Sequence, residues 1–209
     1  MVVTEVSVID LVLALRMKAI PLSASIYEES ARMILREEPD LVAFSVQCAT
    51  FPAVIRLAEI LKQRKPGIRI VAGGHDVSFV AERTLGRFPW FDAVVRGEGE
   101  ITVRELVAAY AGGGNEAGVD GVTWRRGLEI VNNRERELIP NLDDLPVPDY
   151  SLVPGLDVYR DACAIPRAIA ILEAGRGCPH RCVYCAYPVL EGAGLRPDLL
   201  GELDPVQAG

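Results

Sequence analysis

Leu41-Val42-Ala43-Phe44-Ser45-Val46 is an apolar run that only Ser45 interrupts. A continuous run of this kind is typical of a strand that is buried on both faces of a parallel sheet. Residues 26–37 before it and residues 52–64 after it repeat apolar side chains at helical spacing, and a proline lies just past the end of each. The run is therefore predicted to be a buried strand between two helices.

The same alternation continues along the chain. Short apolar runs over residues 68–72 and 93–95 are predicted strands, and residues 77–85 and 101–110 are predicted helices. Residues 2–9 are also predicted to be a strand, because they are rich in valine with polar residues in alternation. Strands that alternate with helices form a mostly parallel sheet with helices on both faces, so the predicted fold class is α/β.

Small and polar residues end the predicted strands. Ligands of such sheets bind at the carboxyl ends of the strands, which meet at one shared edge. The residues that we expect to line this edge are Ser45, Gly73, Gly74, His75 and Gly97.

Three cysteines lie close together near the end of the chain, where Cys178, Cys182 and Cys185 form a C-x3-C-x2-C pattern. Thiolates at this spacing can hold one soft metal centre from a single loop. Three thiolates leave one iron of a four-iron cluster open to a small molecule, whereas structural zinc takes four ligands. An iron–sulfur cluster is our interpretation. Zinc, with His180 as the fourth ligand, is the alternative.

The composition argues against several classes of protein. The 209 residues carry a net charge of −7, which disfavours a surface that wraps nucleic acid. No apolar run reaches the ~20 residues of a membrane helix, and residues 1–15 lack the basic start of a signal peptide. We therefore expect a cytoplasmic protein with no nucleic-acid partner and no membrane span. Cys48 and Cys163 lie among apolar residues and are predicted to be buried, inert thiols.

The second half of the chain has a different character. Residues 119–124 and 128–132 are predicted to form a hairpin, and the proline-rich stretch 140–154 is predicted to be a linker. Residues 168–172 are predicted to be a strand that delivers the cysteine loop. The predicted parts of the chain are residues 1–118, a hairpin and linker over 119–160, and a last part over 161–209.

The cysteine loop, with an aromatic residue just before its last cysteine, resembles that of the radical S-adenosylmethionine (radical SAM) family. In that family the three cysteines hold a [4Fe-4S] cluster, whose fourth iron binds the amino and carboxylate groups of S-adenosylmethionine. The chain from about Val6 to Tyr150 resembles the cobalamin-binding domain that precedes the radical SAM domain in one large branch of the family. The motifs that carry this second resemblance are Pro39-Asp40-Leu41-Val42-Ala43-Phe44-Ser45, Val71-Ala72-Gly73-Gly74-His75, Val94-Val95-Arg96-Gly97-Glu98-Gly99-Glu100 and Leu142-Asp143-Asp144-Leu145-Pro146.

The resemblance implies a Rossmann-like, flavodoxin-type domain for cobalamin, a linker, and the beginning of a radical SAM partial barrel. It implies that S-adenosyl-L-methionine is cleaved to a 5′-deoxyadenosyl radical with an electron from an external donor. The radical would act on a small-molecule or peptide substrate, while cobalamin would donate a methyl group or mediate electron transfer. The residues that the resemblance places at the cofactors are Ser45, Gly73, Gly74, His75, Gly97, Glu98 and Tyr184, with Cys178, Cys182 and Cys185 on the cluster.

Several of these assignments have a structural alternative. Gly73 and Gly74 could form a tight turn, and residues 97–100 could be a helix N-terminus that favours acidic side chains. His75 could be a capping or solvent-facing residue, because the family's Asp-x-His-x-x-Gly cobalt-ligand motif is absent. The chain as a whole could be a non-catalytic corrinoid-binding module or a zinc-bearing interaction protein.

The sequence departs from the family pattern at both ends. The family's first strand and helix, with a Pro-Pro-Leu-Gly-like turn, are missing, so we expect a central strand to be absent from the sheet. The sequence after Cys185 is too short for the partial barrel, which needs on the order of 200 residues, and its end is expected to be disordered. We therefore expect a truncated, weakly stable and aggregation-prone chain that does not turn over S-adenosylmethionine alone.

Overall fold

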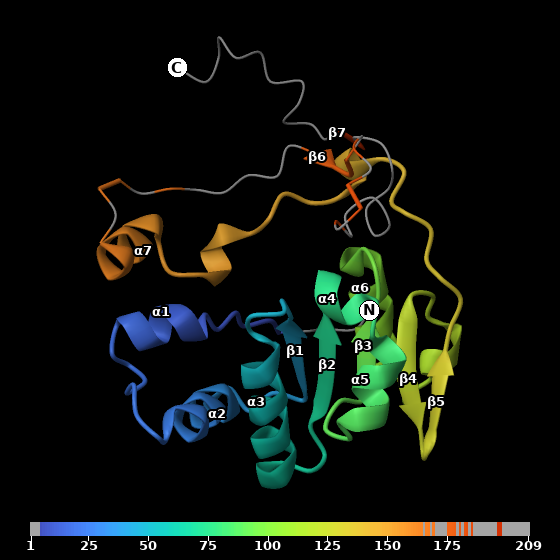
Figure 1. Ribbon diagram of the computed structural model, residues 1–209, viewed down its shortest axis with the longest axis horizontal. Helices are drawn as coiled ribbons and strands as arrows, with labels where there is room; N and C mark the ends of the chain where they lie inside the picture. Colours follow the sequence, from blue (N-terminus) through green and yellow to red (C-terminus); the bar gives the residue numbers. More distant parts are fainter. Residues whose placement is uncertain are drawn as a thin grey trace.

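The computed structural model describes residues 5–164, and further along the chain residues 166, 167, 169, 175–178, 180, 182, 183, 185, 196 and 197. Its centre is a five-stranded sheet with the order β1-β2-β3-β4-β5 (Figure 1). The strands β1 (Leu41–Ser45), β2 (Arg69–Gly73) and β3 (Ala93–Val95) are parallel. The strands β4 (Val122–Arg126) and β5 (Glu129–Asn132) continue the sheet as an antiparallel hairpin. The predicted α/β fold with three parallel strands is confirmed.

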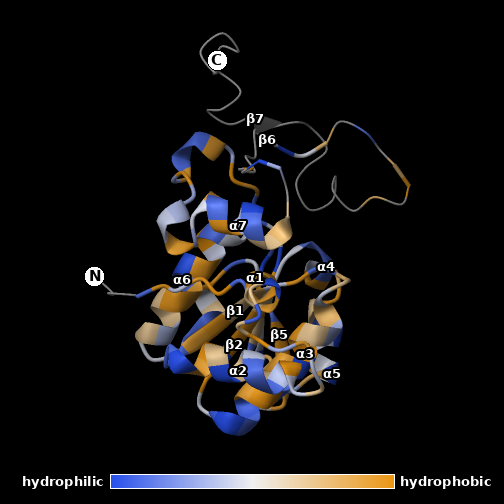
Figure 2. Cartoon of the chain, turned by 90° about the vertical axis from the view of Figure 1, so that its left-hand side faces the viewer, coloured by the Kyte–Doolittle hydropathy of each residue, from blue (hydrophilic) through white to orange (hydrophobic). Residues whose placement is uncertain are grey.

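Helices connect the parallel strands and cover the sheet. The elements of the described residues outside the central sheet are α1 (Leu11–Arg16), α2 (Ile26–Arg36), α3 (Phe51–Arg64), α4 (His75–Ser78), α5 (Ala81–Arg87), α6 (Gly99–Ala111), η1 (Glu116–Gly118), η2 (Leu142–Asp144), η3 (Tyr150–Leu152), α7 (Leu156–Cys163), β6 (Gly175–Arg176) and β7 (Arg196–Pro197). Figure 2 shows that hydrophobic residues gather on the strands and on the helix faces that meet them. The helix α7 packs on α1 and lies above it in both views (Figures 1 and 2).

The sheet separates two hydrophobic clusters, because successive side chains of a strand point to opposite faces. Ile70 and Val94 join the cluster that α2, α3 and α5 cover. Their neighbours Val71 and Val95 join the cluster on the other face, together with Leu106 of α6. The parallel strands are therefore buried on both faces where β2 and β3 lie, as the sequence predicts.

The helix α3 illustrates how the apolar pattern directs the packing. Its buried residues include Val54, Leu57, Ala58 and Leu61, the set that the helical spacing places on one face. A proline occupies the first turn, where the missing N–H group costs no hydrogen bond. The helix thus accommodates the proline in its first turn, and it buries the face that the sequence predicts.

The predicted hairpin is present and forms part of the main sheet. The strand β4 pairs with β3, with Trp124 opposite Ala93, and Gly127 turns the chain with φ of 63°. The Asn133 side chain fixes the hairpin: its Oδ1 accepts a hydrogen bond from the Trp124 indole (3.0 Å), and its Nδ2 donates to two carbonyl groups, those of Glu116 (2.6 Å) and Val119 (2.8 Å). The domain boundary at residue 118 stays a prediction.

Two predicted elements differ in the structure. Residues 5–9 have no regular structure, so the strand predicted over residues 2–9 is wrong in the part that the structure describes. The helix predicted over residues 77–85 is divided into α4 and α5, and Phe79 and Val80 lie between them. Of the strand predicted over residues 168–172, only residue 169 is described, and it is not in a strand.

The strand β1 is less buried than its apolar sequence predicts. Ala43 and Ser45 are exposed, and the remaining residues of β1 are half-buried. The reason is its place in the sheet: among the described residues, β1 pairs with β2 on one side and with no strand on the other. The prediction that β1 is fully buried is therefore wrong, and β1 is an edge strand.

Within the described part of the chain, no helix combines the length and the apolar character that crossing a membrane requires.

Candidate functional site

The loops that follow β1, β2 and β3 meet at one edge of the sheet. Ser45 and Gly73 are register partners at the ends of their strands, and the Val46 amide donates a hydrogen bond to the Gly73 carbonyl (2.7 Å). Gly97 follows β3, and its amide donates to the Ser78 hydroxyl of α4 (3.1 Å). The expectation that Ser45, Gly73 and Gly97 share one edge is confirmed by these contacts.

Gly74 lies close to the backbone of Val46 at this edge. Its φ of 111° and ψ of 170° lie in a region that is essentially restricted to glycine. A Cβ atom here would lie 2.5 Å from the Val46 carbonyl oxygen, whereas a Cβ atom on Gly73 would meet Val95 at an ordinary 3.6 Å. The tight-turn alternative therefore holds for Gly74, because the loop after β1 fills the space beside it.

Two polar residues of α4 hold these loops in place, and neither was predicted from the sequence. The Asp76 carboxylate accepts a hydrogen bond from the Cys48 amide (2.6 Å), which joins α4 to the loop after β1. The Ser78 hydroxyl donates to the Gly74 carbonyl (2.9 Å) while it accepts from Gly97. Their position in the sequence could have indicated this role, because both residues come just after the Gly-Gly pair, where a helix begins beside the ends of other strands.

His75 is the first residue of α4, and its side chain is exposed at this edge. The exposed position agrees with the solvent-facing alternative. Cys48 lies in the neighbouring loop and is also exposed, as is Cys163 at the end of α7. The prediction that Cys48 and Cys163 are buried is wrong, because apolar neighbours in the sequence did not place either residue in the core.

Glu98 has a role that neither sequence interpretation contained. It is the N-cap residue of α6, but its side chain makes no capping bond. Its Oε2 accepts a hydrogen bond from the Ile139 amide (2.6 Å), and its Oε1 lies 3.3 Å from the guanidinium of Arg176. Arg176 also donates to Glu100 (2.5 Å). The acidic run after β3 is thus joined to the segment that precedes the cysteine loop.

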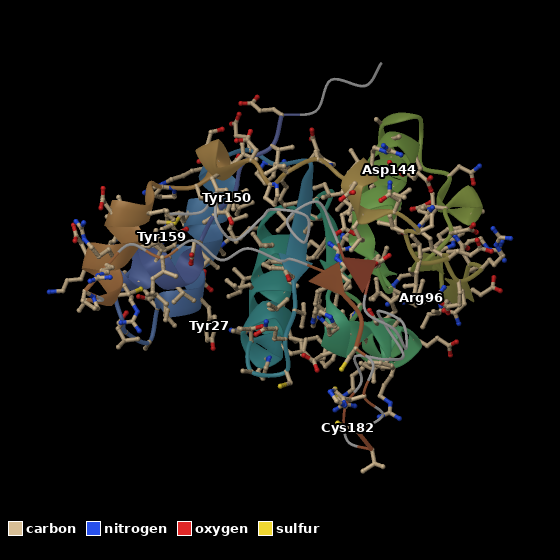
Figure 3. The ribbon with its side chains drawn as sticks, turned by 90° about the horizontal axis from the view of Figure 1, so that it is seen from above. Tyr27, Arg96, Asp144, Tyr150, Tyr159 and Cys182 are labelled. Atoms are coloured by element: carbon tan, nitrogen blue, oxygen red, sulfur yellow. The ribbon has the colours of Figure 1, made fainter. Side chains whose placement is uncertain are left out.

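The three cysteines follow this ionic contact. Cys178 and Cys185 are half-buried and Cys182 is exposed, and the Cys185 amide donates to the Cys182 carbonyl (3.1 Å). Figure 3 shows Cys182 at the outer tip of the loop, far from the labelled Tyr150 and Tyr159. Tyr184 lies outside the described residues.

The cysteine loop contains suitable metal ligands, but its described residues are not arranged as a metal site. Among the residues that the structure covers, no three His, Cys, Asp or Glu side chains lie close enough together to hold a metal ion. The three thiols are free, and their soft sulfur donors on one short loop suit an iron–sulfur cluster. The donor set therefore fits the cluster.

An open cavity of about 590 Å³ lies beside the strand ends, next to Ser78. Arg96 forms part of its wall and is held by Glu135 and by the Asn133 carbonyl (2.6 Å). The cavity is lined by more polar than apolar groups. It can receive a polar portion of a ligand that extends from the edge.

The fold and the edge define a class: an α/β domain that binds a ligand at the carboxyl ends of its parallel strands, with a triple-cysteine loop tied to that edge. Residues 5–107 match the model of the B12 binding domain. The chain belongs to the family of proteins that carry this B12-binding domain, and its homologues include cobalamin-dependent radical SAM methyltransferases.

The similar proteins are longer than this chain. An uncharacterized methyltransferase of Pyrococcus horikoshii is 34% identical, over 77% of this chain and 34% of that protein. The cobalamin-dependent radical SAM methyltransferase TokK of Streptomyces tokunonensis is 33% identical, over 71% of this chain and 22% of that protein. The chain thus spans about a third or less of the length of these curated relatives.

A solved structure shares the fold. The cobalamin-dependent S-adenosylmethionine radical enzyme OxsB, solved with aqua-cobalamin and S-adenosylmethionine, superposes with a TM-score of 0.62 and 23% identity. The match covers 84% of this chain and 24% of OxsB. At this identity the likeness establishes the fold alone.

Proposed function

We propose that this chain binds cobalamin at the carboxyl edge of β1, β2 and β3, and a [4Fe-4S] cluster on Cys178, Cys182 and Cys185. It would do so as part of a cobalamin-dependent radical SAM enzyme. The observation that carries the proposal is the direct contact between Arg176, just before the cysteine loop, and the acidic run after β3. That contact brings the two candidate cofactor sites together in a chain with a B12-binding domain.

The residues at the edge suit a wide, flat ligand. Ser45 is exposed at the end of β1, and nothing lies within 4 Å of the position that a Cβ atom on Gly97 would take. A corrinoid could approach the backbone closely at such positions because no side chain intervenes. Gly73 and His75 lie on the same edge, while Gly74 shapes the loop that the ligand would meet.

The cysteine loop would hold the cluster through three thiolates and leave one iron for S-adenosyl-L-methionine. When bound, the cofactors supply reductive cleavage of S-adenosylmethionine and a methyl group or an electron at cobalt, and the protein orients them. The contacts of Arg176 with Glu98 and Glu100 would hold Cys178, two positions further along the chain, near the edge. Tyr184, next to Cys185, is proposed to contact the same cofactors. We propose methyl transfer to a small molecule or peptide, with the electron supplied by an external donor, because homologues include methyltransferases.

The test is anaerobic reconstitution of the purified chain with iron and sulfide, followed by titration with cobalamin. Iron and sulfide content and visible absorption report the cluster, and a change in the cobalamin spectrum reports the corrinoid site. We expect Cys178→Ala, Cys182→Ala and Cys185→Ala each to abolish cluster formation. Cys48→Ala and Cys163→Ala are the matched controls and should retain it, because both lie outside the loop.

The outcomes separate the candidate functions. Cobalamin binding without a cluster would identify a corrinoid-binding module, and zinc without iron in metal analysis would identify a zinc-bearing protein. A full cluster in Cys182→Ala would contradict the proposed ligand set. Failure to bind cobalamin would contradict the proposed edge.

A further inference from the structure

We propose that Glu98 and Arg176 form an ionic joint that positions the cysteine loop against the corrinoid edge. The joint is the set Glu98, Glu100, Ile139 and Arg176. It connects three segments: the first turn of α6, the chain that leads into the linker, and the strand β6 before the cysteines. The inference rests on the proposed function, because it assigns a role to residues between the two cofactor sites.

The burial of Glu98 shows that the contact belongs to the folded arrangement. Only 4% of the Glu98 side chain and 14% of the Arg176 side chain are exposed. A buried carboxylate is costly unless a positive charge and hydrogen-bond donors compensate it. Here the Ile139 amide satisfies one oxygen at 2.6 Å, and Arg176 faces the other at 3.3 Å. Docking of the segment before the cysteine loop therefore supplies a positive charge that helps to compensate the burial of the Glu98 carboxylate.

Arg176 is suited to this role because its guanidinium can contact two carboxylates at once. It reaches Glu98 through Nη1 and Glu100 through Nη2. Glu98 is the N-cap residue of α6 and Glu100 lies in its first turn, where the helix dipole also favours negative charge. The 39% exposure of Glu100 makes its contact the weaker of the two, since solvent screens it.

The joint limits where the first cluster ligand can lie. Only Gly177 lies between Arg176 and Cys178, so the Cα atoms of these two residues can lie at most about 7 Å apart. The acidic run comes directly after β3, so this short tether holds Cys178 beside the carboxyl end of the sheet. Figure 1 shows β6 above the end of the sheet at which β2 ends, with α4 and α6 below it. Glu98 and Arg176 thus act as positioning residues, and neither needs to touch a cofactor.

The first experiment needs no cofactor and uses the whole chain with its thiols reduced. We measure the rate of alkylation of Cys178 by mass spectrometry, with the exposed Cys48 and Cys163 as internal standards. The variants are Arg176→Gln and Glu98→Gln. The glutamine in Glu98→Gln keeps an oxygen that can accept from Ile139, so the fold is retained. The matched control is Arg134→Gln, which breaks the exposed 2.8 Å pair with Asp120.

The two variants distinguish docking from a simple change in local charge. Loss of a positive charge near Cys178 disfavours its reactive thiolate, and loss of a negative charge favours it. A local charge effect alone would therefore slow alkylation in Arg176→Gln and speed it in Glu98→Gln. The joint predicts that both variants alkylate Cys178 about tenfold faster, the change expected when a charge-assisted contact of the docked state is lost. Unchanged rates, or opposite changes, would overturn the joint, and Arg134→Gln should match the wild type.

The second experiment tests positioning in the loaded protein. After reconstitution, electron paramagnetic resonance measures the magnetic coupling between cob(II)alamin and the reduced cluster. We expect Arg176→Gln to bind both cofactors at the wild-type ratio but to lose this coupling, and Arg176→Lys to restore part of it. Coupling equal to that of the wild type would contradict the joint. If the wild type binds neither cofactor, the proposed function fails, while the alkylation rates still decide whether the joint exists.

Discussion

Replacement of Gly74 by alanine tests the geometry of the candidate edge most directly. The added Cβ atom would lie 2.5 Å from the Val46 carbonyl oxygen and 3.0 Å from the Val46 nitrogen. Both are backbone atoms, so the clash cannot be relieved by a side-chain rotation. The backbone conformation of Gly74, with φ of 111°, adds strain for any residue that carries a Cβ atom.

The expected cost has two parts. Holding a residue other than glycine in this region of φ and ψ costs about 1–3 kcal/mol. Forcing an extra carbon into a closely packed position costs about 1–3 kcal/mol more. We therefore expect Gly74→Ala to lower the free energy of unfolding by about 4 kcal/mol, a large share of the 5–15 kcal/mol that is typical of a folded domain.

Two other glycines supply graded controls. Gly97 has φ of 66° with nothing within 4 Å of its Cβ position, so Gly97→Ala carries backbone strain without a clash and should cost about 1–2 kcal/mol. Gly67 has open space and no positive φ, so Gly67→Ala should change stability by less than about 1 kcal/mol. Urea unfolding of the cofactor-free chain, followed by circular dichroism, measures all three. If Gly74→Ala is no more destabilising than Gly97→Ala, the close approach to Val46 is wrong.

Three further predictions concern the hairpin, a buried tyrosine and the sheet edge. Asn133→Leu leaves the Trp124 indole N–H and two carbonyl groups without their partner, so it should lower the unfolding free energy by about 1–3 kcal/mol in urea unfolding; an unchanged midpoint would contradict this role. Burial, reinforced by the charges of Glu116 and Asp92, raises the pKa of Tyr110 above its ordinary value of 10.0. The folded protein thus favours the neutral phenol, so this contribution to stability is complete below pH 10 and is lost as the pH rises through the raised pKa. Tyr110→Phe should therefore make the stability of the protein fall less steeply above pH 10. An equally steep fall in the variant would refute the assignment. Ala43→Lys places a charge on the edge strand β1 and should shift any associated chain toward monomer in light scattering, whereas an unchanged mass would show that β1 is not the contact.

The elements that could be predicted from the sequence are those whose signals are local. The apolar runs over residues 68–72 and 93–95 became β2 and β3, and α3 buries the face that its spacing indicates. The shared edge followed as well, because parallel strands bring their carboxyl ends together whatever the details of packing. Periodicity and topology together were sufficient for this part of the site.

Burial at the edges of the fold could not be predicted in the same way. The apolar run of β1 is the same in sequence whether a neighbouring strand is present or absent, so it could not reveal that Ala43 is exposed. Cys163 illustrates the same difficulty on a helix, since α7 has no buried residue despite its apolar positions. Residues 5–9 alternate as a strand does, but a strand also needs a partner along the sheet, and the described residues provide none for them.

The acidic run after β3 shows why a correct motif can still leave its chemistry open. From the sequence, Glu98 was either a cofactor contact or an acidic residue favoured by the dipole of α6. The deciding facts are contacts with Ile139 and Arg176, which are 41 and 78 residues away along the chain. A residue that only complements a helix dipole gains nothing from burial, because desolvation weakens its charge without adding a partner. A side chain that is 4% exposed and paired with an arginine from a distant segment is instead a contact between segments. The location of the acidic residues after β3 could thus be predicted from the sequence. The role of Glu98 could not, because it depends on where the fold places Arg176.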